Sequence, residues 1–266
     1  MRNEQLTIAS NVARLAHPAP SPGADRGAAA ALQIRVLSGF QLLHDGVDVS
    51  LSETSQHLLA VLAVKGRPMH RLKLSAIFWP DASEKQALAN LRSALWRIVA
   101  PAHDALEIGP RSLGIAAGVR VDLRISEAVA HRILDRTTAL SEDQLVATTG
   151  HLQEDLLPGW YDDWSIYESE RWRQLRMHAL EGAARRLCES GHLPAALDIA
   201  LLAVDADPLR ESAHAEVIRV HLAERNQSEA IRAFDRCCSV LRTELGLEPS
   251  EHLRSLVSPT IRLPVR

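Results

Sequence analysis

A spacing of 34 residues recurs between apolar positions in the second half of the chain, and it restricts the fold more than any other feature. The positions separated by 34 are Ala179, Ala183 and Ala184 before Ala213, Val217 and Ile218, and Ala196, Leu197 and Ala200 before Ala230, Ile231 and Phe234. Small residues at this period are typical of tetratricopeptide repeats, in which helix pairs stack on their neighbours. Apolar periodicity predicts helices at 165–190, 193–206, 209–224 and 227–245, and Pro208 stands where one repeat passes into the next. Two repeats fall short of the roughly three that an isolated array needs, so the helices predicted within 122–150 must complete or cap the stack.

The N-terminal half has a different order of predicted elements. Residues 1–31 are rich in Pro, Ala and small polar residues, which predicts a flexible leader. Short alternating strands are predicted in 34–51, with Asp45-Gly46 as a turn. Three helices follow, and 106–123 predicts a hairpin with turn residues Gly109, Pro110 and Gly114 and a return strand toward Val119 and Val121. Strands, three helices and a hairpin are the plan of a winged helix-turn-helix.

The third helix of this half, predicted over 84–99, has two contrasting faces. At 100° per residue one face carries the apolar residues Leu88, Leu91, Leu95, Ile98 and Val99. The opposite face carries Gln86, Asn90, Ser93 and Arg97 with Ala89, and no carboxylate. Amide, hydroxyl and guanidinium groups read base edges in a major groove, so we predict that these four residues contact bases. The alternative is an ordinary solvated amphipathic helix.

The charge of the helix-turn-helix segment differs from that of the whole chain. Residues 65–97 hold seven Lys or Arg against two acids, a local charge of +5, whereas the 266 residues together carry −3. This local excess favours contact with phosphates and salt-sensitive binding. The predicted backbone contacts are Lys73, Lys85, Arg92 and, at the hairpin tip, Arg111 and Ser112; for the last two a solvated turn remains the alternative.

Half of the ten aromatic residues lie within thirteen positions. They are Trp160, Tyr161, Trp164, Tyr167 and Trp172, next to the Pro158-Gly159 corner. Buried rings hold a junction rigidly, so we predict a structural aromatic cluster with Asp162 or Asp163 capping the helix that follows. A small-molecule or peptide pocket is the alternative.

Three segments resemble one known family. QALANLRSALWRI is similar to its recognition helix, DLLPGWYDDWSIYESERWRQLRMHALEGAA to the beginning of its activation domain, and EAIRAFDRCCSVLRTELGLEPSEHL to its last repeat and terminal helix. The family is that of the Streptomyces antibiotic regulatory proteins (SARP), and the resemblance covers about 32–256. It implies a winged helix joined to a bacterial transcriptional activation domain (BTAD). It also implies an activator that binds promoter direct repeats in double-stranded DNA, recruits RNA polymerase holoenzyme and often controls secondary-metabolite genes. No GxxxxGK[ST] motif occurs, so the small form without an ATP site is expected.

Several other classes of protein lack support in the sequence. The twelve histidines show no HExxH spacing, and no GxSxG, GxGxxG or CxxC motif occurs, so neither an enzyme, a metal site nor a cofactor is expected. Three cysteines, two of them adjacent, are not a disulfide framework and indicate a reducing compartment. No apolar run reaches the roughly 20 residues of a membrane span and no signal peptide is evident, so the cytoplasm is predicted.

These observations combine into one prediction of fold and function. The fold class is mainly α with a small β component. The expected domains are a leader at 1–31, a winged helix at 32–121, a tetratricopeptide-like domain at 122–256 and a tail at 257–266. The predicted function is a DNA-binding transcriptional activator without enzymatic activity, with self-association on DNA. The alternative is a helical-repeat interaction scaffold whose winged helix no longer binds specific DNA.

Overall fold

A small sheet opens the described part of the chain. The computed structural model describes residues 32–261, so the predicted leader, 1–31, lies outside the described residues. The strands of this sheet are β1 (Leu32–Arg35), β2 (Gln41–His44), β3 (Val47–Asp48) and β7 (Arg120–Val121), in the order β3-β2-β1-β7. Asp45 and Gly46 both have positive φ, 50° and 82°, as a tight hairpin turn between β2 and β3 requires. Short strands form in the predicted segment, but the last one ends at Asp48 and does not reach Leu51. The parallel pairing of β7 with β1 joins segments too distant for a local pattern to reveal.

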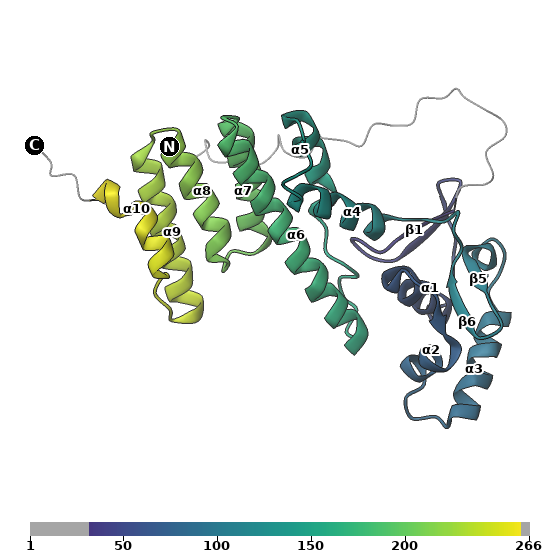
Figure 1. The fold of residues 1–266 in the computed structure, drawn as a ribbon. Coiled ribbons are helices and arrows are strands. Elements are labelled where there is room, and N and C mark those ends of the chain that lie inside the picture. The colour runs from purple at the N-terminus through teal and green to yellow at the C-terminus, as the bar shows by residue number, and fades with distance from the viewer. Residues whose placement is uncertain (1–31, 262–266) are drawn as a thin grey trace, which may run out of the picture. The chain divides into compact units, whose positions relative to one another are not determined.

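Three helices follow as predicted: α1 (Glu53–Lys65), α2 (Arg71–Phe78) and α3 (Glu84–Trp96). The hydroxyl of Ser52 caps α1 by accepting from the Ser55 amide, and Gly66 ends it in the left-handed conformation. Every side chain from Leu58 to Val64 is buried, so α1 is enclosed on all sides rather than on the single face that the periodicity indicates. It is thus the central helix of the N-terminal half, and α2 and α3 lie near it (Figure 1).

A second sheet forms the predicted wing. Its strands are β4 (Met69–His70), β5 (Leu106–Ile108) and β6 (Ser112–Ile115), in the order β4-β6-β5, and the short helix η1 (Ala102–Ala105) leads into it. Two details of the predicted hairpin are wrong. Gly114 lies inside β6 against Pro68 instead of in a turn, and the return strand ends at Ile115 because residues 120–121 join the first sheet. Strand β4 is too short for a sequence pattern to predict.

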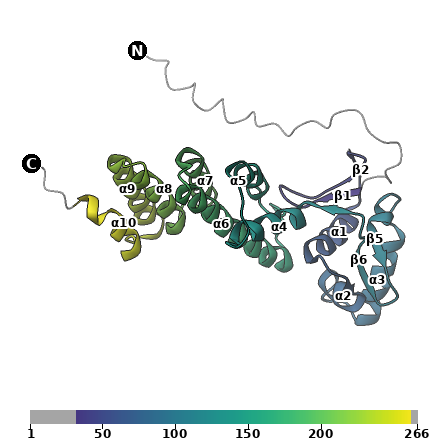
Figure 2. The same ribbon diagram turned by 45° about the horizontal axis from the view of Figure 1, so that its top comes forward.

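The remaining described chain is helical. Its helices are α4 (Asp122–Leu134), α5 (Glu142–Thr149), η2 (Gly150–Leu152), α6 (Asp163–Glu189), α7 (Leu193–Ala206), α8 (Glu211–Ala223), α9 (Gln227–Leu245) and α10 (Glu251–Ile261). Helices α7 and α9 have the predicted bounds, and α6 to α9 lie side by side in chain order (Figures 1 and 2). Most of the 34-residue positions are fully buried, including Ala183, Ala200, Ala213 and Ala230, because small residues let adjacent helices approach closely. The predicted fold class, mainly α with a small β component, is confirmed.

The C-terminal boundary of the predicted helical domain lies inside a helix. Helix α10 continues to Ile261, and Val257 is 1% exposed, so the predicted tail at 257–266 begins too early. The apolar positions Leu253 and Val257 lie one helical turn apart and pack into the core, which extends the helix past residue 256. The described residues belong to one compact unit, and the division into two domains at 121 and 122 stays a prediction.

The first residue of α4 bonds directly to the N-terminal sheet. The Asp122 carboxylate accepts hydrogen bonds from the amides of Val36 (3.0 Å), Leu37 (3.1 Å) and Leu123 (2.7 Å). Burial raises the pKa of this carboxyl above its usual value, and the hydrogen bonds act against that rise. From the other side, the Leu157 amide donates to the Val36 carbonyl at 2.8 Å. The end of β1 is therefore held between the start of α4 and the segment before α6.

The aromatic residues form less of a cluster than predicted. Trp160 and Trp164 meet edge to face with centroids 6.1 Å apart, and Trp160 also contacts His57 (4.2 Å) and Phe40 (6.5 Å). These contacts join the segment before α6 to α1 and to the residue that precedes β2, as a structural role requires. The prediction is wrong for Tyr161 and Tyr167, which are 83% and 70% exposed.

Trp172 has a separate structural position. It is 3% exposed, and its indole N–H donates to the Glu154 carbonyl at 2.9 Å. Trp172 lies two helical turns beyond Trp164, so it packs on the segment before α6 instead of on the other rings. Asp162 occupies the N-cap of α6, but its side chain makes no capping hydrogen bond, so the predicted cap acts only through its charge and that of Asp163 in the first turn.

The C-terminus of α1 provides a sharp test of packing. Gly66 has φ +60°, and an added Cβ would overlap the Arg124 guanidinium, which donates to the carbonyls of Ala63 (2.8 Å) and Val64. We expect Gly66→Ala to lower the free energy of unfolding by about 1–2 kcal/mol for the left-handed backbone, plus about 1–3 kcal/mol for the displaced hydrogen bonds.

Gly246→Ala is the matched control. Gly246 ends α9 with φ +66°, and nothing lies within 4 Å of the position that a Cβ would occupy, so only the backbone cost applies there. Urea unfolding of both variants measures the difference. Equal losses would show that the Arg124 contact contributes nothing to stability.

Candidate nucleic-acid interface

Helix α3 packs through a narrow apolar face. Ala87, Leu91, Leu95 and Ile98 are at most 8% exposed, and Leu88 is half-buried. The prediction for Val99 is wrong, because Val99 is 56% exposed: α3 ends at Trp96, so residue 99 leaves the helical spiral. Ser83 caps the helix by accepting from the Gln86 amide at 3.4 Å. The side-chain amide of Gln86 donates to Asn90 and forms no capping box with Ser83.

The four predicted base-reading residues share the outer side of this helix. Gln86, Ser93 and Arg97 are exposed and Asn90 is half-buried. The Gln86 amide donates to Asn90 Oδ1 at 3.0 Å, so the two side chains form one hydrogen-bonding edge. Arg97 is the C-cap residue and keeps helical φ and ψ, −84° and −8°, which leaves it in line with the other three. The structure therefore brings the four side chains together on one solvent-facing surface, here called the α3 outer face.

The predicted backbone contacts lie on α2, on α3 and in the wing. Lys73 on α2 and Lys85 and Arg92 on α3 are exposed. Arg111 is exposed in the turn between β5 and β6, and Ser112, the first residue of β6, is half-buried. The Gly109 amide donates to the Ser112 carbonyl at 2.9 Å and closes the turn. The side chains thus come from the helix-turn-helix and from the wing, as binding to a duplex backbone requires.

Arg71 has a role that the sequence did not reveal. Its guanidinium donates to the Gly109 carbonyl at 3.0 and 3.3 Å, and its amide donates to the Arg111 carbonyl at 2.9 Å. These bonds tie the first residue of α2 to the tip of the wing. Arg71 is therefore a positioning residue for the wing and not a free cation. No local pattern indicates this, because the two segments are 38 residues apart.

Lys65 is also bound within the protein. Its ammonium lies 2.6 Å from Glu168 Oε1 on α6. Of the seven basic residues between 65 and 97, those that remain exposed are Arg67, Lys73, Lys85, Arg92 and Arg97. These five keep an excess of positive charge on the surface of the helix-turn-helix segment.

Trp96 is an exposed ring on one flank of α3. It is 88% exposed, and it follows Lys85, Ala89 and Arg92 at spacings of four, three and four along one flank of the helix. Side chains at these spacings lie above one another. An exposed indole in line with two cations offers an apolar ring and one N–H donor beside the α3 outer face.

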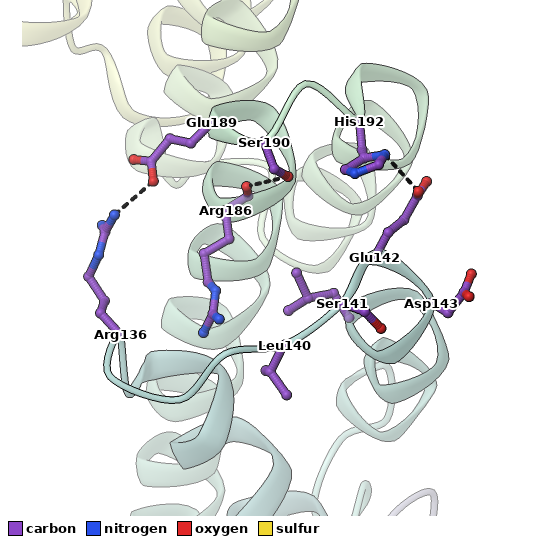
Figure 3. Close-up of a pocket in the computed structure, with 10 residues that line it drawn as sticks. Arg136, Leu140, Ser141, Glu142, Asp143, Arg186, Glu189, Ser190 and His192 are labelled. Carbon is purple, nitrogen blue, oxygen red and sulfur yellow. Dashed lines mark hydrogen bonds and ion pairs between the residues drawn. The ribbon is translucent and has the colours of Figure 1, made fainter.

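A concave site lies among the helices of the C-terminal half. It has a volume of about 660 Å³ and is lined by the α4–α5 connection and the α6–α7 turn (Figure 3). An ion pair joins Arg136 to Glu189 at 2.7 Å, and His192 Nδ1 lies 2.6 Å from a carboxylate oxygen of Glu142. Arg186 is engaged by the carbonyls of Ile133 and Thr138, at 3.0 and 2.7 Å. The cations of this pocket are thus neutralised or hydrogen-bonded by the protein itself.

Metal-binding and thiol chemistry have little support in the described part of the chain. Among residues 32–261, no group of three or more His, Cys, Asp or Glu is arranged to hold a metal ion. The three cysteines are free, and burial raises the pKa of the Cys237 thiol to about 12, which disfavours the reactive thiolate. Within the same range, no helix is long and apolar enough to cross a membrane.

Comparison with known proteins identifies the helical half. The sequence profile of the family described as "Bacterial transcriptional activator domain" matches residues 127–259. A structure of Mycobacterium tuberculosis EmbR in complex with a low affinity phosphopeptide is similar, with a TM-score of 0.68 and 18% sequence identity; the match covers 90% of this chain and 67% of that chain. At this identity the likeness shows the fold. No curated protein matches the chain.

Proposed function

Because this chain belongs to the bacterial transcriptional activator domain family and is a transcriptional activator of the SARP type, we propose that it binds double-stranded promoter DNA through α3. Helix α3 enters a major groove with the α3 outer face toward the bases. The wing turn at Arg111 and Ser112 contacts the backbone of the same duplex. Helices α4 to α10 form the part that recruits RNA polymerase holoenzyme.

The α3 outer face is the observation that supports this proposal. Asn and Gln pair with adenine through one acceptor and one donor, and Arg pairs with guanine through two donors. The hydrogen bond from Gln86 to Asn90 leaves the Gln86 carbonyl and the Asn90 amide donors on adjacent edges. No Asp or Glu occurs from Lys85 to Arg97, so the approach of this helix to phosphates meets no like charge.

Three finer parts of the proposal rest on the family and not on the site. They are binding to direct repeats, self-association on DNA, and control of a secondary-metabolite gene cluster. Genome-wide footprinting with the purified chain identifies the bound sequences, and the spacing of protected half-sites shows whether they are direct repeats. Run-off transcription with purified holoenzyme then measures recruitment.

Salt dependence tests whether the chain binds DNA through its phosphates, and comparison with a scrambled duplex tests whether the binding is specific. We expect the dissociation constant for a footprinted duplex to rise steeply between about 50 and 200 mM salt, with a logarithmic slope of several units, because each neutralised phosphate releases counterions. Mobility shift and fluorescence anisotropy measure it, with a scrambled duplex as control. Failure to shift any duplex at low salt would contradict the proposal and favour the interaction scaffold.

A further inference from the structure

A small basic pocket lies at the base of the helix-turn-helix. It has a volume of about 170 Å³, and its lining comes from the end of α1, strand β4 and the start of α2. The lining residues are Lys65, Arg67, Pro68, Met69, His70 and Lys73. Three of these carry permanent positive charge, and none of these described residues is acidic. The pocket therefore has the charge of a site for an anion.

The protein holds this pocket in shape through contacts on each side. His70 pairs with Ser112 in the wing sheet, and its Nδ1 accepts the Leu72 amide at 3.3 Å, which fixes the ring over the first turn of α2. Gly66 and Arg124 fix the end of α1. The pocket is thus built on rigid elements, as a binding site requires.

Its cations differ in what they already contact. Within the described part of the chain, neither Arg67 nor Lys73 has an acidic partner at ion-pair distance, and both are exposed. Lys65 is 23% exposed and pairs with Glu168, which is 10% exposed. One cation of the pocket is therefore shared with α6, whereas two are free to meet an incoming anion.

We propose that this pocket binds a phosphate of the DNA backbone, and that Lys65 exchanges Glu168 for that phosphate when the duplex docks. The inference rests on the proposed function and extends it. A phosphate seated among Arg67, His70 and Lys73 lies within the same lining as Lys65 and competes with Glu168 for its ammonium. DNA binding thereby weakens one contact between α1 and α6.

Glu168 has a second partner, which lowers the free-energy cost of removing Lys65 from its carboxylate. Arg171, one turn further along α6, lies 3.5 Å from Glu168 Oε2 and is 68% exposed. When Lys65 turns toward a phosphate, Arg171 remains to neutralise the carboxylate. The largely buried Glu168 is then not left as an unpaired charge, which would otherwise oppose the exchange.

The first experiment measures the pocket's share of DNA binding. Arg67→Gln is expected to weaken binding to a footprinted duplex about three- to tenfold at low salt and to reduce the logarithmic salt slope by about 1. Arg236→Gln on α9 makes the same charge change on an exposed residue outside the pocket and is expected to bind like the parent. Equal affinity and equal salt slope for Arg67→Gln and the parent would contradict the inference that the pocket binds a phosphate of the DNA.

The second experiment tests the exchange of Lys65. Glu168→Gln is expected to raise DNA affinity roughly threefold, because Lys65 no longer has to leave a carboxylate. The gain is expected to disappear when Lys65→Met is added, and Glu244→Gln on α9 controls for the general effect of removing a negative charge. Weaker or unchanged binding by Glu168→Gln, with its circular dichroism intact, would overturn the exchange.

Free inorganic phosphate is the competing occupant. If phosphate, compared with chloride at equal ionic strength, raises the unfolding temperature of the parent but not of Arg67→Gln, and DNA affinity is the same for both, the pocket is a free-anion site and the inference is wrong. If the parent binds DNA and Asn90→Ala weakens it while Arg67→Gln does not, only the pocket inference fails. A parent that binds no duplex overturns both.

Discussion

The double variant Asn90→Ala, Arg97→Ala is expected to bind its operator about 100-fold more weakly than the parent. Each bidentate contact to a base contributes about 1–3 kcal/mol of discrimination, so the loss of two gives a large effect. Both side chains lie on the α3 outer face and neither supports the core. Fluorescence anisotropy at constant salt measures the change, and unfolding temperature confirms the fold.

Lys85→Gln separates base contacts from backbone contacts. Lys85 is exposed on the flank of α3, so its loss is expected to weaken specific and scrambled duplexes alike and to reduce the salt slope by about 1. The variant Asn90→Ala, Arg97→Ala should instead reduce the difference in affinity between the operator and the scrambled duplex. If it retains the parent's preference for the operator, the bases are read by another surface.

The variant Trp172→Ala is expected to lower the free energy of unfolding by about 3–5 kcal/mol, the range for a large buried aromatic residue. Trp172 is 3% exposed and its indole hydrogen-bonds the segment that also holds β1. Removal of the ring leaves a cavity and an unsatisfied carbonyl at Glu154, and both effects have the same sign.

Two further variants isolate these effects in urea unfolding. Trp172→Phe keeps most of the ring volume and loses the hydrogen bond, so a loss of about 1–3 kcal/mol is expected. Tyr167→Ala, at a position that is 70% exposed on the same helix, is expected to change stability by less than about 0.5 kcal/mol. A similar loss in Tyr167→Ala and Trp172→Ala would contradict the assignment of Trp172 as the structural ring.

The elements that the sequence predicted well are those determined by local pattern. Helices α7 and α9 begin and end at the predicted residues because apolar periodicity, Gly246 and the segment around Pro208 act within a few positions. The α3 outer face lies toward solvent as predicted. An uninterrupted polar strip opposite Leu91 and Leu95 means that the helix can pack on the core only through its apolar face.

The features that escaped prediction depend on distant contacts. The pairing of β7 with β1, the bonds from Arg71 to the wing and the pair between Lys65 and Glu168 each join segments at least 38 residues apart. Tyr161 and Tyr167 look like members of one cluster in the sequence. In the structure Tyr161, which precedes α6, and Tyr167, which lies on α6, face solvent, while Trp172 is buried.

The direct passage from β7 into α4 has a consequence for promoter architecture. Val121 ends the strand, Asp122 begins the helix, and the Asp122 carboxylate bonds back to β1, so the chain has no slack at this point. In the proposed activator, the position of α3 in the major groove then determines on which side of the duplex the helical region lies. The effect of such a protein then depends on the rotational position of its operator on the duplex. An operator displaced by half a turn of B-DNA, about 5 base pairs, places the helical region on the opposite side of the duplex.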